Sequence, residues 1–260
     1  MNHQQQTTIL MIHGLWCGAW CWEHYQRYFE QQGYRVIAVD LPYHGNHIQH
    51  PHPKLAMASM KDYLQFVIDI IQSLDEKPIV IGHSMGGLLA QMLAARNLVQ
   101  KSVLLCPAPP AGILAMRPSI LKTFMPVVLI PNFWAQSIPV RYESAKYAVL
   151  NKIEDEEESH RIVNQMGYES GRVLFEIGAW AMDLQHTTFV DAKKIQTPML
   201  ILSAEYDNIM PASVVWEIYQ YYKHTAEYHC LDNHAHWVLG EKGWEKICQQ
   251  IQQWIETVSC

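Results

Sequence analysis

The chain has 260 residues, of which 49% are hydrophobic and 17% charged, with a formal net charge of −6 at pH 7. This length and composition predict one globular core, with room for an inserted subdomain. A negative net charge argues against binding to nucleic acids or anionic membranes, so small neutral or apolar partners are favoured. No apolar run predicts a membrane span, because Pro126 and Pro131 interrupt the longest candidate.

The cysteines and the N-terminal residues indicate the compartment. None of the six cysteines forms a C-x-x-C motif or a disulfide framework. Cys17 and Cys21 lie four residues apart, but without histidine or carboxylate partners at ligand spacing they do not predict a metal site. The first residues, M-N-H-Q-Q-Q-T-T, do not resemble a signal peptide. We expect a reduced, cytoplasmic protein that is a monomer or a homodimer.

The first predicted strand covers residues 8–12, and H-G-L-W follows it directly at 13–16. A His-Gly loop in this place has two interpretations. It is either a glycine turn with a packed histidine or an oxyanion loop, in which the Leu15 N–H would stabilise a developing negative charge. Trp16 is a candidate substrate contact next to it.

The next elements are a helix at residues 20–32, which Gly33 ends, and a strand at 35–40. Asp40 closes this strand and is either a catalytic acid or, as we favour, a residue that ties down its own loop. A group of histidines follows, consisting of His44, His47, His50 and His52. No carboxylate or thiolate lies among them, so a solvated rim loop is favoured over a metal site.

An amphipathic helix is predicted over residues 59–74, and a short buried strand over 79–81. The strand leads into G-H-S-M-G at 82–86, which fits the G-x-S-x-G pattern of a nucleophile elbow. Such an elbow is a sharp turn from a strand into a helix. The helix-compatible sequence L-L-A-Q-M-L-A-A-R-N follows at 88–97, as this interpretation requires.

In an elbow, Ser84 would sit strained at the tip of the turn. Gly82 and Gly86 flank it because the turn brings their backbones so close that a Cβ at either would collide. The serine hydroxyl would then lie at a helix N-terminus, where the Met85 N–H is a second candidate oxyanion donor. His83 stands beside the serine and is a candidate substrate contact.

After a strand at 101–106 the sequence changes character. Residues 107–196 contain no clean strand but have proline-punctuated apolar runs, an acidic run at 154–158 and a helical pattern through Trp180. We expect a mostly helical cap over the end of the sheet that carries Ser84. The acidic run is interpreted as a solvated helix face. Trp134 and Trp180 are candidate pocket residues.

The remaining elements resume the alternation of strands and helices. Strands are predicted at 197–203 and 226–231, and a terminal helix at 244–255. This alternation is typical of an α/β protein with a mostly parallel sheet and helices on both faces. Residues 1–106 and 197–260 would form this core, and 107–196 the cap.

Two loops in the last part supply possible partners for Ser84. Asp207 follows a strand, where the acid of a catalytic triad would be presented; Glu205 competes, but the spacing to Pro211 favours Asp207. His236 and His234 lie two residues apart, and the turn before them favours His236 as the base. The chain order serine, aspartate, histidine is the order expected of this arrangement.

Together these motifs resemble the α/β-hydrolase superfamily, and within it the small capped esterases and lipase-like hydrolases. The resemblance rests on H-G-L-W, V-D-L-P-Y-H-G, G-H-S-M-G-G, Asp207 with a proline four residues later, and H-W before the last helix. It implies that Ser84 is the nucleophile, His236 the general base and Asp207 its orienting acid. It also implies that Leu15 and Met85 supply the oxyanion N–H groups.

The sequence departs from the family pattern at two points. Only about eight residues precede the first strand, so the two antiparallel strands that usually begin the fold have no room, and a sheet of about six strands is implied. Tyr43 stands where the D-L-P-G-H-G turn usually has glycine.

The expected function is hydrolysis of carboxylic esters with short to medium apolar acyl groups through an acyl-enzyme. Thioesterase, lactonase and carbon–carbon bond hydrolase or lyase activities use the same triad, and the fold does not choose among them. A protein that binds a ligand under the cap without turnover is the alternative of another class. No metal, nucleotide or flavin motif is present, so no cofactor is expected.

Overall fold

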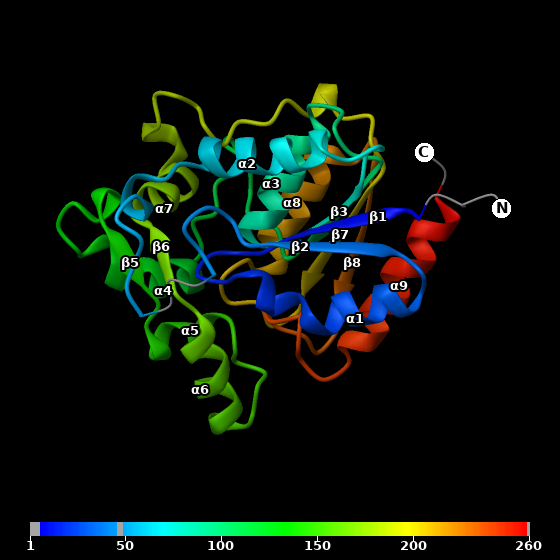
Figure 1. Ribbon diagram of the computed structural model, residues 1–260. Helices are drawn as coiled ribbons and strands as arrows, with labels where there is room; N and C mark the ends of the chain where they lie inside the picture. Colours follow the sequence, from blue (N-terminus) through cyan, green and yellow to red (C-terminus); the bar gives the residue numbers. More distant parts are fainter. Residues whose placement is uncertain (1–5, 46–48, 259–260) are drawn as a thin grey trace.

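A computed structural model describes residues 6–45 and 49–258 and has a six-stranded sheet at its centre (Figure 1). The strand order is β2-β1-β3-β4-β7-β8, and every neighbouring pair is parallel. The strands are β1 (Thr8–Ile12), β2 (Arg35–Val39), β3 (Ile79–His83), β4 (Lys101–Leu105), β7 (Met199–Ala204) and β8 (Ala226–Leu231). The predicted fold class and all six predicted strands are confirmed.

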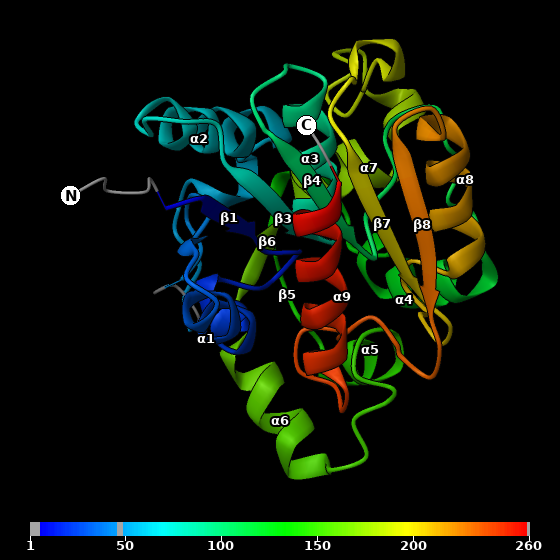
Figure 2. The same ribbon diagram turned by 90° about the vertical axis from the view of Figure 1, so that its right-hand side faces the viewer.

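Helices cover both faces of this sheet. Figures 1 and 2 show α2, α3 and α8 on one face and α1 and α9 on the other. These helices are α1 (Glu23–Gln31), α2 (Met60–Gln72), α3 (Met85–Ala94), α8 (Ala212–Tyr222) and α9 (Trp244–Thr257), and short 3-10 turns lie at Ala19–Trp22, Leu55–Met57, Phe133–Ala135, Trp180–Met182 and Ala192–Lys194. Of the five, only α8 was not predicted. Among the described residues, no helix is both long and apolar enough to cross a membrane.

The sheet separates two apolar clusters, because successive strand residues point to opposite faces. Ile9 and Met11 of β1 pack in the cluster that contains side chains of α1 and α9. Leu10 and Ile12 pack in the other cluster, with side chains of α2, α3 and α8. Strand β3 is buried along its whole length, as expected for a central parallel strand covered on both sides. The loops that leave these strands therefore start from fixed positions.

Residues 107–196 connect β4 to β7 in the sequence, although these two strands are neighbours in the sheet, and the connecting residues contain their own helices and strands. The helices are α4 (Pro118–Val128), α5 (Tyr142–Ala148), α6 (Glu156–Gln165) and α7 (Gly171–Gly178), and β5 (Ser137–Pro139) pairs antiparallel with β6 (Tyr168–Ser170). Figure 1 shows them gathered at the left of the view. The expectation that this segment lacks strands was wrong. Each strand has three residues, too few to give a periodic pattern.

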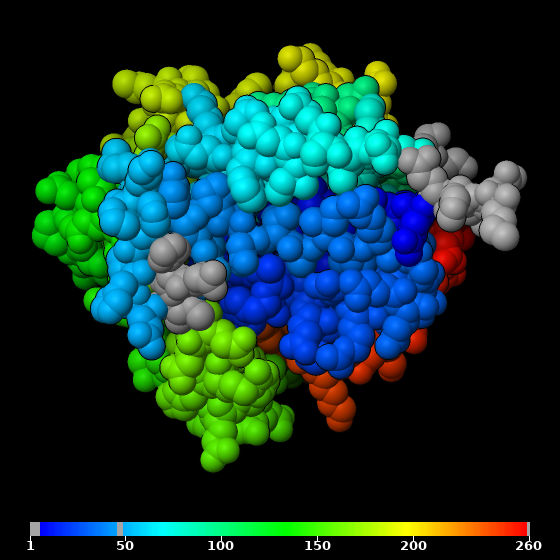
Figure 3. Space-filling view, viewed as in Figure 1, coloured from blue at the N-terminus to red at the C-terminus, as the bar shows by residue number. Residues whose placement is uncertain are grey.

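Helix α6 projects from the lower edge of the molecule (Figure 3). Its first turn contains Glu156, Glu157 and Glu158, and the Asp155 side chain accepts hydrogen bonds from the N–H groups of two of them. Carboxylates are favourable at this end of a helix because the exposed N–H groups carry partial positive charge. The solvated helix face predicted for residues 154–158 is thus confirmed for Glu156, Glu157 and Glu158, whereas Glu154 precedes the helix and Asp155 caps it.

The turn between β3 and α3 has the strained geometry predicted for an elbow. Ser84 has φ 54° and ψ −117°, a conformation that L-residues rarely adopt. A Cβ added to Gly82 would lie 2.2 Å from the Gly86 carbonyl oxygen, so the predicted collision is confirmed there. A Cβ on Gly86 would instead meet the Ile12 carbonyl oxygen of β1 at 2.0 Å. The neighbouring strand, as well as the turn itself, therefore excludes a side chain.

Candidate active site

The structure brings Ser84, Asp207 and His236 together at the carboxyl ends of three parallel strands. Ser84 follows β3, Asp207 lies in the loop after β7, and His236 lies in the loop after β8. All three are buried, with exposed fractions of 4%, 4% and 2%. In parallel sheets the carboxyl ends of the strands share one edge, which explains why residues so distant in sequence meet.

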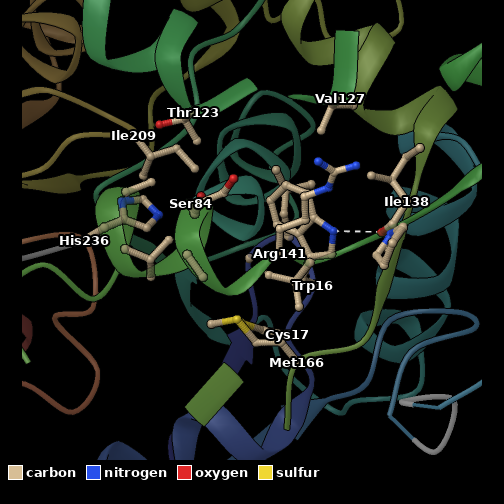
Figure 4. A pocket seen from close by; sticks show the side chains of 18 of the residues that line it. Trp16, Cys17, Ser84, Thr123, Val127, Ile138, Arg141, Met166, Ile209 and His236 are labelled. Carbon is tan, nitrogen blue, oxygen red and sulfur yellow. Dashed lines mark hydrogen bonds between the residues drawn. The ribbon is translucent and has the colours of Figure 1, made fainter. Parts of the chain in front are cut away.

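Asp207 and His236 form a close, buried pair. The His236 Nδ1 donates to Asp207 Oδ2 at 2.7 Å, while Asp207 Oδ1 accepts the N–H groups of Ile209 at 2.9 Å and Met210 at 2.7 Å. These bonds fix the carboxylate and give the imidazole the tautomer whose Nε2 is an acceptor. Figure 4 shows the His236 ring pointing toward Ser84.

The competing residues from the same loops have other partners. The Glu205 side chain accepts the Asn233 N–H at 2.8 Å. His234 Nδ1 lies 3.2 Å from Oε2 of the buried Glu241. The structure therefore pairs Asp207 with His236, and it places His234 in a contact that holds its own loop.

Asp40 holds a neighbouring loop, the one after β1, by a hydrogen bond. Its Oδ1 accepts the Ala19 N–H at 2.7 Å, and its carboxylate lies against Gly18 and Gly45 so closely that a Cβ at either would be within 2.9 Å of it. The favoured structural role of Asp40 agrees with these contacts, but its hydrogen bond ties down the loop after β1 and not its own loop, as had been expected.

Ser84 and His236 line one apolar cavity (Figure 4). The cavity has a volume of about 70 Å³, counted as the space that the centres of water-sized molecules can reach. One water needs roughly 10–15 Å³ on this measure, so the cavity can hold several. Its other walls come mainly from the loop after β1 and from residues 107–196, with further contributions from His83 of β3 and from the loops after β7 and β8. They include Leu15, Trp16, His83, Thr123, Val127, Ile138, Arg141, Ser144, Met166, Ile209 and Trp237. The predicted contacts Trp16 and His83 thus lie at the cavity.

Two of the predicted pocket residues do not line this cavity. Trp134 is 48% exposed, and its ring packs 6.4 Å from that of Phe175. Trp180 lies in a 3-10 turn after α7 and is also absent from the cavity wall. The apolar walls are instead made by smaller residues of α4, β5 and α5, whose positions depend on how 107–196 folds back over the sheet.

The loop after β1 lies directly against the serine. A Cβ added to Gly14 would be 2.9 Å from the Ser84 Cβ. Within the part of the chain that the structure describes, neither the Leu15 N–H nor the Met85 N–H has a hydrogen-bond partner. The Met85 side chain is fully buried, so only its N–H could serve the cavity. Two backbone N–H groups without a partner among the described residues therefore lie next to Ser84, one in the residue that follows it and one in the loop packed against it.

His83 supports the backbone of the His236 loop. Its Nε2 donates to the His236 carbonyl oxygen at 2.9 Å, and the two rings lie 4.6 Å apart. Burial and the neighbouring His236 lower the pKa of His83 well below its ordinary value. The His83 ring is therefore neutral at physiological pH, and its hydrogen bond holds the backbone of His236 in place.

The histidine group after β2 contains a functional candidate that the sequence interpretation missed. The His44 side chain is only 2% exposed and contacts the fully buried Glu169 of β6, with Nε2 to Oε2 at 3.1 Å. The prediction of a solvated rim loop is wrong for His44. It agrees with the exposed His50, whereas His52 stacks on Tyr43, and His47 lies outside the described residues.

The partners of His44 determine its charge. Its Nδ1 contacts the Pro42 carbonyl oxygen at 3.0 Å and its Nε2 contacts a carboxylate, and both partners can only accept. A doubly protonated ring satisfies both. Burial opposes this charge, but Glu169 outweighs it, so the pKa of His44 is raised. Burial opposes the charge of Glu169 as well, but His44, the Ser170 N–H and the Tyr63 hydroxyl together outweigh it and lower the pKa of Glu169.

Cys106, Asp207 and His236 form the one group of potential metal ligands among the described residues, with ligand atoms within 4.8 Å of one another. Burial and Asp207 raise the pKa of the Cys106 thiol well above its ordinary value, whereas metals bind the thiolate. Both carboxylate oxygens of Asp207 already accept hydrogen bonds from the protein. The group is better described as a hydrogen-bonded aspartate and histidine than as a metal site.

One model of a known protein family matches most of this chain. The family model described as "Alpha/beta hydrolase family" matches residues 9–250. Methylesterase 7 of Arabidopsis thaliana is 33% identical over 97 residues, which are 36% of this chain and 36% of that protein. Polyneuridine aldehyde esterase of Rauvolfia serpentina is 33% identical over 89 residues, 34% of this chain and 33% of that protein. These matches span about a third of the length of the curated relatives.

Solved structures resemble the chain over nearly its whole length. A methylesterase from Arabidopsis superposes with a TM-score of 0.74 at 12% identity, covering 97% of this chain and 100% of that one. A monoacylglycerol lipase of Paleococcus ferrophilus gives a TM-score of 0.70 at 19% identity, covering 96% of this chain and 95% of that one. At these identities the likeness establishes a shared fold.

His13, at the start of the loop after β1, should make stability depend on pH. The ring accepts the Leu41 N–H through Nε2 and donates to the Gly14 carbonyl through Nδ1, and burial and His44 lower the pKa of His13 from 6.5 to about 4. Below pH 6.5 the unfolded chain binds a proton that the native ring refuses. The contribution to stability is thus complete above pH 6.5 and is lost as the pH falls toward 4.

Replacing His13 by Gln should make the free energy of unfolding depend less on pH. Its slope below pH 6.5 should fall by up to about 1.4 kcal/mol per pH unit, which corresponds to one proton. The measurement is the free energy of unfolding in urea between pH 4.5 and 7.5. His229 is exposed on β8, so His229→Gln serves as the control and should keep the wild-type slope. An unchanged slope in His13→Gln would contradict the assignment of a neutral, acid-sensitive ring.

Proposed function

Because the chain belongs to the alpha/beta hydrolase family, we propose that it is a serine hydrolase that cleaves small carboxylic esters. The observation that carries this proposal is the arrangement around Ser84. A strained serine at the start of α3 shares an apolar cavity with His236, whose other nitrogen donates to Asp207 at 2.7 Å. The names of the curated relatives, which are esterases, support the same reaction class.

In the proposed mechanism His236 accepts the hydroxyl proton of Ser84 through Nε2 as the oxygen attacks the ester carbonyl. Asp207 holds the imidazole tautomer and stabilises the imidazolium that forms. The Leu15 and Met85 N–H groups would receive the tetrahedral oxyanion. His236 then protonates the leaving alcohol, and a water molecule repeats the cycle on the acyl-enzyme to release the acid.

The cavity supports a small, mostly apolar substrate. Its walls are chiefly carbon, and the side chains of Thr123, Arg141 and Ser144 supply polar groups besides the predicted catalytic residues. Two relatives are methylesterases by name, which favours an ester with a small alcohol group. We therefore propose short to medium acyl chains and exclusion of bulky tertiary-alcohol esters.

Replacing Ser84 by Ala should abolish covalent labelling by a fluorophosphonate and lower kcat for esters by about 10⁴- to 10⁶-fold, because a catalytic triad acts as a unit. Labelling followed by mass spectrometry and steady-state kinetics measure the two effects. Ser144→Ala is the matched control, since this serine also lines the cavity but has no histidine partner among the described residues. Retention of a tenth of the activity in Ser84→Ala would favour a ligand-binding protein without turnover.

The two neighbouring histidines should differ sharply. His236→Ala should cost about as much kcat as the loss of Ser84, whereas His234→Ala should cost at most a modest factor by loosening its contact with Glu241. Steady-state ester kinetics on both variants measure this. If His234→Ala is inactive and His236→Ala retains near-normal turnover, the proposed base is wrong.

The cavity wall should set the acyl chain length. Val127 of α4 lines the cavity, so Val127→Trp should lower the ratio of kcat/KM for hexanoyl over acetyl esters by on the order of 10-fold. Val128 is 61% exposed on the outer side of the same helix, and Val128→Trp should leave the ratio unchanged. A p-nitrophenyl ester series measures both ratios. Equal effects of the two substitutions would place the acyl chain elsewhere.

A further inference from the structure

Glu169 of β6 is a fully buried carboxylate whose acceptor positions are all used. Oε1 accepts the Tyr63 hydroxyl at 2.9 Å and the Ser170 N–H at 2.7 Å. Oε2 accepts His44 Nε2 at 3.1 Å and the Trp16 N–H at 3.3 Å. Four donors from four parts of the chain thus converge on one side chain, which the hydrolytic mechanism does not use.

The contact with Trp16 joins this carboxylate to the loop after β1. Trp16 has φ 61°, in the left-handed region that a residue with a side chain adopts only when its surroundings hold it there. The Trp16 N–H belongs to the peptide bond between Leu15 and Trp16. The orientation of this peptide constrains the backbone of Leu15, which carries the proposed oxyanion N–H. The carboxylate therefore contacts the loop one peptide away from the proposed oxyanion donor.

Two more bonds hold Trp16 to residues 107–196. The Gly167 N–H donates to the Trp16 carbonyl oxygen at 2.9 Å, and the indole Nε1 donates to the Ile138 carbonyl oxygen at 2.9 Å (Figure 4). The indole also stacks on Phe124 at 6.3 Å. These contacts fix the side chain and the carbonyl of Trp16, and Glu169 is the partner of its N–H.

We propose that Glu169 is a positioning residue that holds the loop after β1 in the conformation in which the Leu15 N–H faces the oxyanion. This inference rests on the proposed function, since it assigns a role in the same reaction. Glu169 touches neither substrate nor Ser84. It acts through the Trp16 N–H, and His44 and Tyr63 keep its carboxylate in place.

The chemistry of the four donors explains why a carboxylate is required. An amide offers one acceptor oxygen, and its NH₂ group would face two donors. In a buried site, such a mismatch leaves donors unpaired and weakens the hold on the loop. Glu169→Gln is therefore nearly isosteric with the native residue but leaves either the Trp16 N–H or the Ser170 N–H without an acceptor, depending on which side its oxygen takes.

A second buried carboxylate provides a matched control. Glu176 of α7 also joins residues 107–196 to the core, and it accepts hydrogen bonds from Ser59 Oγ, the Met60 N–H and Arg172 Nε. It has no contact with the loop after β1 among those that the structure describes. Glu176→Gln therefore removes the same charge at the same kind of junction without disturbing Trp16.

The experiment compares the two variants in ester kinetics and in binding of a trifluoromethyl ketone, whose hemiketal oxygen mimics the oxyanion. Glu169→Gln should lower kcat by about 10- to 100-fold with KM within about 3-fold of wild type, a part of the loss caused by removing an oxyanion donor. Its affinity for the trifluoromethyl ketone should fall by the same factor as kcat/KM. Glu176→Gln should stay within about 3-fold of wild type in all three quantities.

Equal losses in both variants, or a loss in KM alone, would overturn the proposal, because they would indicate a role in folding or substrate binding only. If Glu169→Gln does not fold, Tyr63→Phe takes its place, since it removes one of the two donors that fix Oε1 and so loosens the carboxylate that the Trp16 N–H contacts. It should lower kcat and ketone affinity together by about 3- to 10-fold, and no change would overturn the proposal.

The wild-type protein distinguishes this failure from failure of the proposed function. If the fluorophosphonate does not label Ser84 and no ester is turned over, the hydrolase proposal fails. If the wild type is labelled and active while Glu169→Gln behaves like Glu176→Gln, only the role of Glu169 fails.

Discussion

The close approach of β1 to the turn at Ser84 is the constraint on which the site depends. A Cβ on Gly86 would lie 2.0 Å from the Ile12 carbonyl oxygen, and one on Gly14 would lie 2.9 Å from the Ser84 Cβ. The turn can therefore keep its strained serine only while the neighbouring strand and its loop stay in place. Burial of β1 and β3 in two apolar clusters holds both strands there.

Residues 107–196 both line the cavity and hold the loop after β1. They contribute the apolar walls from α4, β5 and α5, and they also bind the backbone and side chain of Trp16. The loop with the proposed oxyanion donor is thus held between the sheet on one side and β5 and β6 on the other. A change in the packing of these strands would reach the chemistry through that loop.

The sequence predicted the parts whose signal is local. Six strands, the elbow and the loops with Asp207 and His236 follow from short runs of apolar residues and from motif spacing. The pair of His44 and Glu169 could not be found in this way, because 125 positions separate two residues that have no motif in common. Trp134 and Trp180 failed as pocket residues for a related reason. An aromatic side chain in an irregular segment gives no indication of which way it faces.

Four histidines with buried side chains lie near the carboxyl ends of the strands, two of them (His83 and His236) on the cavity wall, and their hydrogen-bond partners assign a different task to each. His13 has one donor and one acceptor as partners, and a neutral ring satisfies both. His44 has two acceptors and takes a second proton. His83 donates to a carbonyl and stays neutral. His236 alone combines a carboxylate on one nitrogen with a place on the cavity wall for the ring, and this combination is what the proposed mechanism requires of its general base.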